Sequence, residues 1–110
     1  FTAMEPPPTD IAAVDPALVL LRDPGHPVAD AIRGIRTRLA ESWTGAPADA
    51  QVVALLGADE FCETGPIAAN LAAALALGGQ STLLVDAKID APSLHLLFGV
   101  PLAPRLTRRF

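Results

Sequence analysis

Residues 51–86 read QVVALLGADEFCETGPIAANLAAALALGGQSTLLVD, and this stretch decides the fold that the sequence predicts. Two short apolar runs, 51–57 and 81–86, flank an alanine-rich segment that ends at two consecutive glycines. Each run has the length of a strand and the continuous apolar character of strands that are buried on both faces. The segment 66–77 begins with proline and has the length of a helix. The order strand, loop, helix, strand is a βαβ unit, which predicts a parallel sheet covered by helices.

A further helix is expected over residues 27–42, ahead of the first apolar run. Pro27 suits the first position of a helix, and Asp30 near the start favours the helix dipole. Four apolar residues at helical spacing predict one buried stripe, which consists of Val28, Ile32, Ile35 and Leu39. Residues 92–98 predict a short helix, and residues 17–21 predict a strand or an extended segment.

The composition is that of one small domain: 110 residues, 51% hydrophobic and 18% charged, with a formal net charge of −4. No nucleic-acid partner is expected, because general nucleic-acid binding needs a basic surface. A single cysteine, Cys62, excludes an internal disulfide and a cysteine-cluster metal site, and we expect no metal site of another kind. No apolar run approaches the length of about 18 residues that a membrane span needs. No signal peptide is visible, so we expect a cytoplasmic protein.

The chain divides into two parts in this interpretation. Residues 1–25 contain three consecutive prolines and no amphipathic period near their start, and we expect a flexible segment there. The first four residues, 1–4, either are native or were left by an expression vector. Residues 26–110 are expected to form the α/β domain, in which the loop 58–65 follows the first strand. In such a unit this loop and the start of the next helix bind the ligand, commonly a phosphate.

Four segments carry a resemblance to a known family, namely 27–37, 68–72, 83–87 and 92–101. In their order and spacing they resemble the cytoplasmic domain of the bacterial tyrosine kinases of exopolysaccharide and capsule synthesis. These kinases are relatives of the MinD/ParA group of P-loop ATPases. The match runs from His26 to Leu106. It implies a three-layer parallel sheet of the P-loop NTPase (Rossmann-like) type, of which residues 26–110 are the N-terminal half.

The resemblance also implies a role for three residues of the first helix. The family has an oligomerisation motif there, E-x-x-R-x-x-R. This chain has Asp30 in place of the glutamate, and Arg33 and Arg36 match the two arginines. Arginine pairs with carboxylates in a bidentate way, which suits contacts across an interface. The resemblance therefore implies a homo-oligomer.

When the chain is aligned with the family, it differs from the family's nucleotide-binding motifs at several positions. A P-loop has the pattern G-x-x-x-x-G-K-[ST]: the glycines free backbone N–H groups for the phosphates, the lysine neutralises them and the hydroxyl holds magnesium. At these four positions the chain has, in order, Ala58, Glu63, Thr64 and Gly65. In the family's second Walker element, D-x-D, Asp86 keeps the first aspartate and Lys88 replaces the second. The family's tyrosine cluster is absent, since the chain has no tyrosine.

These substitutions are expected to weaken nucleotide binding. Like charges about 4 Å apart repel by about 1 kcal/mol in water and by about 4 kcal/mol at an effective dielectric of 20. Glu63 brings such a charge to the loop, and the attraction of the missing lysine is lost as well. Several kcal/mol correspond to a loss of affinity for Mg-ATP of more than about a hundredfold. Lys88 either pairs with the carboxylate of Glu63 or Asp86 or is an exposed lysine in a turn.

The function expected from these observations is that of a pseudokinase with no catalytic residue and no bound cofactor. It would act by self-association and by contact with a membrane polysaccharide co-polymerase or export protein at the inner-membrane face. One alternative is a tyrosine autokinase that binds ATP and Mg²⁺, and another is a MinD/ParA-like ATPase. Either would be completed by further sequence or by another subunit. The helix with Arg33 and Arg36 favours the polysaccharide kinases over the MinD/ParA-like proteins.

Overall fold

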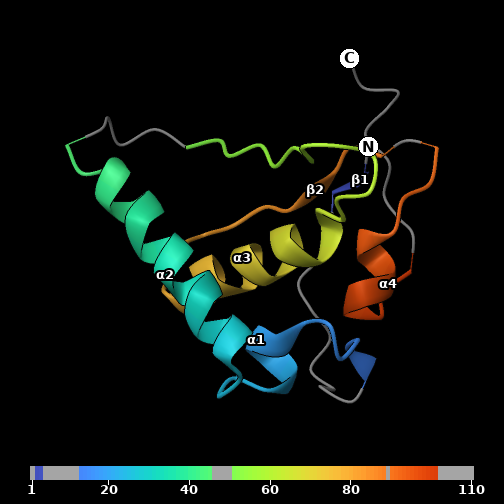
Figure 1. Ribbon diagram of the computed structural model, residues 1–110, viewed down its shortest axis with the longest axis horizontal. Helices are drawn as coiled ribbons and strands as arrows, with labels where there is room; N and C mark the ends of the chain where they lie inside the picture. The colour runs from blue at the N-terminus through green and yellow to red at the C-terminus, as the bar shows by residue number, and fades with distance from the viewer. Residues whose placement is uncertain (1, 4–12, 46–50, 89, 102–110) are drawn as a thin grey trace.

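Three helices pack around a fourth, α3, in the computed structural model, which describes residues 2–3, 13–45, 51–88 and 90–101 (Figure 1). The helices are α1 (Val19–Arg22), α2 (Pro27–Ser42), α3 (Gly65–Leu77) and α4 (Leu94–Phe98). Two strands of two residues each, β1 (Thr2–Ala3) and β2 (Val85–Asp86), complete the described elements. None of the helices in these ranges is long and apolar enough to cross a membrane.

Helix α3 is central because it is apolar on almost every side, and such a helix is stable only when other elements cover it. Its buried residues are Ala69, Asn70, Leu71, Ala73, Ala74 and Leu75. The sequence predicts a helix over 66–77, and the structure confirms it with a start one residue earlier. The helix ends at Gly78, and the following Gly79 has a φ of 93°, which favours glycine.

Helix α2 has the bounds that the sequence predicts, 27–42. Its N-terminus is capped by His26, whose Nδ1 accepts the backbone N–H of Val28 at 3.0 Å. The buried face differs from the predicted stripe, because Val28 and Ile35 remain 47% and 42% exposed. Of the predicted stripe, Ile32 is buried and Leu39 packs partly buried against the core, and Ala29, which lies outside the stripe, is buried as well. The small side chain of Ala29 allows α2 to lie close to the alanine-rich face of α3, and this turns the buried face of α2 toward Ala29.

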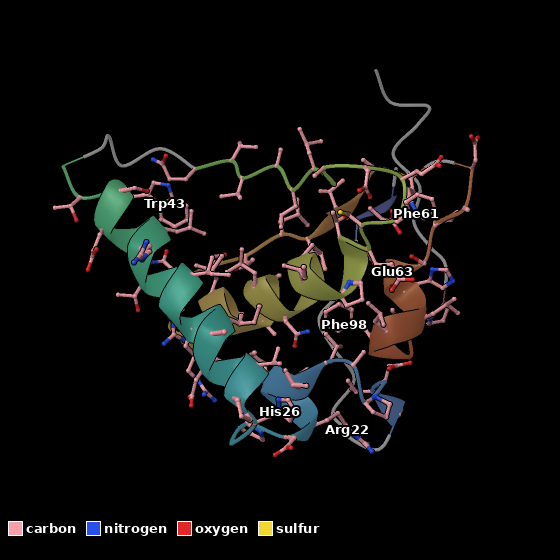
Figure 2. All side chains as sticks on the ribbon, in the orientation of Figure 1. Arg22, His26, Trp43, Phe61, Glu63 and Phe98 are labelled. Carbon is pink, nitrogen blue, oxygen red and sulfur yellow. The ribbon has the colours of Figure 1, made fainter. Side chains whose placement is uncertain are left out.

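The core has two parts, one on each side of α3. The first contains Leu20, Ala29, Ile32, Leu71, Ala73, Ala74 and Leu75, with Leu39 and Trp43 of α2 and its C-cap packed against it. The second contains Val14, Leu18, Ala69, Leu94 and Phe98. Figure 2 shows Trp43 at the far end of α2 and Phe98 between α3 and α4. The first part joins α2 to α3, and the second joins α3 to α4 and to the segment before α1.

Residues 13–25 contribute to both parts of the core. Val14, Leu18 and Leu20 are each at most 2% exposed. The backbone N–H of Asp15 donates to the carbonyl of Leu97 in α4 at 2.9 Å. Of the expected flexible segment, the structure describes only residues 2–3 and 13–25, and the division at residue 25 stays a prediction. The expectation of a strand or extended segment over 17–21 is wrong, because α1 begins within it.

The expected three-layer parallel sheet is wrong for the described part of the chain. Its two strands, β1 and β2, pair antiparallel, with Thr2 opposite Asp86 and Ala3 opposite Val85. Residues 51–57 belong to no strand, and residues 81–84 do not extend β2. A parallel sheet needs helices on both of its faces. Here α1, α2 and α4 bury their apolar residues against α3, so they do not form layers over a sheet.

Candidate functional site

The loop 58–65 is held by a turn at Asp59 and is largely open to solvent. The carboxylate of Asp59 accepts the backbone N–H of Phe61 at 2.9 Å, and its carbonyl accepts that of Cys62 at 3.3 Å. Glu63 is exposed at the junction of this loop with the start of α3, near α4 (Figure 2). The described loop therefore presents acidic side chains to solvent where the resemblance to the kinases would place the phosphates.

The four residues that the family resemblance aligns with the P-loop pattern lie along this loop and at the start of α3. Ala58 and Glu63 are exposed, whereas Thr64 and Gly65 are half-buried. Thr64 is the N-cap residue of α3, but its side chain makes no capping hydrogen bond. Gly65 lies beside the start of α4: a Cβ at Gly65 would be 3.6 Å from Cδ2 of Leu94. The loop therefore leads into a helix start that packs against α4.

Asp86 is the most enclosed acidic residue of the described chain, at 5% exposure. Its Oδ1 accepts the backbone N–H of Lys88 at 3.0 Å. Its Oδ2 accepts the N–H groups of Ser93 at 2.8 Å and Leu94 at 3.0 Å. Hydrogen bonds to a carboxylate are among the strong ones, and they satisfy N–H groups at the start of α4. Asp86 therefore ties β2 to α4.

Lys88 forms no ion pair with any carboxylate of the described residues. Among the described residues the ion pair found is that of Arg33 with Asp30, so of the two alternatives for Lys88 the structure shows the exposed lysine and not the pairing with Glu63 or Asp86. The backbone N–H of Lys88, rather than its ammonium, contacts Asp86. Backbone groups already satisfy Asp86, and an exposed ammonium keeps its hydration. Lys88 is thus an exposed lysine in the turn after β2.

Asp30 and Arg33 form an ion pair on the solvent side of α2. Nη1 of Arg33 lies 2.9 Å from Oδ1 of Asp30, and their side chains are 33% and 77% exposed, respectively. Nη2 of Arg33 donates to the carbonyl of Pro24 at 2.8 Å, which ties the loop before α2 to the helix. Both side chains remain accessible to another molecule.

Arg36 makes a contact of a different kind. Its Nη1 donates to the carbonyl of Ala74, near the end of α3, at 2.9 Å. The same carbonyl accepts the N–H of Gly78 at 3.0 Å. No basic residue lies in the last turn of α3 itself, so Arg36 of α2 supplies a positive charge at that helix end. The three residues of the expected oligomerisation motif therefore separate into an exposed pair and one interhelical contact.

Asn70 is a structural residue that the site prediction does not include. Its Oδ1 accepts the backbone N–H of Leu20 at 3.2 Å, and its Nδ2 donates to Ala17 at 2.9 Å and to Pro66 at 2.8 Å. It is 4% exposed and joins α3 to the segment that enters α1. The signal in the sequence is a single amide inside a helix of alanine and leucine.

The residues at the loop do not fit Mg-ATP in the manner of a P-loop. Thr64 stands where the family resemblance expects the P-loop lysine, and Glu63 beside it is exposed. Both oxygens of Asp86 are engaged by backbone N–H groups. Within the ranges that the structure describes, no three His, Cys, Asp or Glu side chains are grouped so as to hold a metal ion.

The sequence is similar to a known protein over most of its length. Over 89 residues, which are 81% of this chain, it is 35% identical to the "Putative tyrosine-protein kinase EpsB" of Ralstonia solanacearum. The matched region is 12% of the length of that relative, so this chain spans a small part of it. No family model matches the chain, and no solved structure gives a significant match. The similarity supports a relationship with the bacterial tyrosine kinases.

Proposed function

We propose that this chain is a non-catalytic relative of the tyrosine autokinases of exopolysaccharide synthesis and that it acts through protein contacts. The observation that carries the proposal is the start of α3, where Glu63 and Thr64 stand at the positions of a glycine and a lysine. A phosphate at this helix end would lie near carboxylates and find no ammonium group from the loop. The backbone contacts of Asp86 add support, because they leave neither of its oxygens without a partner.

The proposed contacts are of two kinds. The chain associates with itself through the exposed pair of Asp30 and Arg33 on α2. It also binds a membrane polysaccharide co-polymerase or export protein at the cytoplasmic face of the inner membrane. Charged side chains that stay accessible at a helix surface suit both steering and pairing with a partner. Arg36 is excluded from this surface in the proposal, because its guanidinium contacts Ala74.

A calorimetric titration with Mg-ATP and with Mg-ADP tests whether the chain binds nucleotide. We expect no heat of binding at millimolar nucleotide. The matched control is the double variant Glu63→Gly with Thr64→Lys, which removes a carboxylate and supplies an ammonium at the start of α3. Weak binding by this variant alone would assign the loss to these two positions. Binding of either nucleotide by the unaltered chain at micromolar concentration would contradict the proposal.

The second candidate function is that of an ATP-binding tyrosine autokinase, completed by further sequence or another subunit. It is favoured by the name of the Ralstonia relative, which describes a tyrosine-protein kinase. Incorporation of phosphate into tyrosine of a partner by a longer form of the protein would support it. Absence of incorporation, together with absence of nucleotide binding, would favour the non-catalytic function.

A further inference from the structure

We draw no further inference here: the strongest candidate, the open apolar segment 52–56 ahead of the loop 58–65, where Val52 and Leu56 are 91% and 88% exposed, carries nothing because nothing in the structure shows what covers it.

Discussion

Helix α3 and the open segment 51–57 have similar apolar content and very different surroundings. The helices pair their backbone groups within themselves and bury their apolar faces on one another. The segment 51–57 has apolar side chains but neither a strand beside it nor a layer over it among the described residues. A helix needs neighbours only for its side chains, whereas a strand needs them for its backbone as well. Apolar character alone therefore does not create a strand.

The contrast is sharpest where side chains reach from one element to the backbone of another. Asn70, Asp86 and Arg36 each contact backbone groups of another element. Asn70 joins α3 to α1, Asp86 joins β2 to α4, and Arg36 joins α2 to α3. No such contact reaches residues 52–57 in the described structure. Substitutions in the two regions should therefore have very different effects on stability.

The largest effect is expected for Asn70→Ala. The change leaves the buried N–H of Leu20 without its partner and also removes the partly buried hydrogen bond to the carbonyl of Ala17. Buried groups left unsatisfied cost about 1–3 kcal/mol each, so we expect a loss of about 3 kcal/mol in the free energy of unfolding measured with urea. Gln80→Ala, at an exposed position, is the control and should change this energy by less than about 0.5 kcal/mol. Equal values for the two variants would mean that Asn70 does not hold α1 to α3.

Gly99→Ala is expected to have the next largest effect. Gly99 ends α4 with a φ of 67°, and a Cβ there would meet the carbonyl oxygen of Ala13. The left-handed backbone and the crowding together should lower the free energy of unfolding by at least about 2 kcal/mol. Gly34→Ala is the matched control, because a Cβ at Gly34 meets nothing within 4 Å inside α2. That variant should gain about 0.5–1 kcal/mol, and a loss at Gly34 would contradict the described packing of α2.

A smaller effect is expected for Arg36→Ala. The variant loses the hydrogen bond to Ala74 and the positive charge at the end of α3. A hydrogen bond from a charged group and a charge at a helix end together contribute about 1–2 kcal/mol. Because Arg36 is partly exposed, we expect the lower value, a loss of about 1 kcal/mol in the free energy of unfolding. Thermal unfolding, measured at two salt concentrations, should show a larger loss of stability for Arg36→Ala than for Arg38→Ala. Arg38 is the control because it lies at an exposed position of the same helix. If Arg38→Ala destabilises as much, the effect comes from the charge of α2 in general.

The sequence predicts α2, α3 and α4 because their signals are local, but it misses α1, where a strand or an extended segment is expected. Pro27 marks the start of α2, and Gly78 marks the end of α3. Strand pairing is not local: β2 pairs with Thr2–Ala3, more than 80 residues away in the chain, rather than with 51–57. The loop substitutions at Glu63 and Thr64 can be seen in the sequence, because they replace defined residue types. The contacts of Asp86 and Arg36 cannot, because their partners are backbone groups that every residue carries.

The smallest change in the free energy of unfolding is expected for substitutions in the open segment 51–57. In Val52→Thr with Leu56→Thr, two side chains that are already 91% and 88% exposed become more polar. Because folding of the single chain buries almost none of their surface, its free energy of unfolding should change by less than about 0.5 kcal/mol. The measurement belongs in dilute protein, where a second copy does not contribute. A loss above about 1 kcal/mol there would mean that the single chain already covers these side chains.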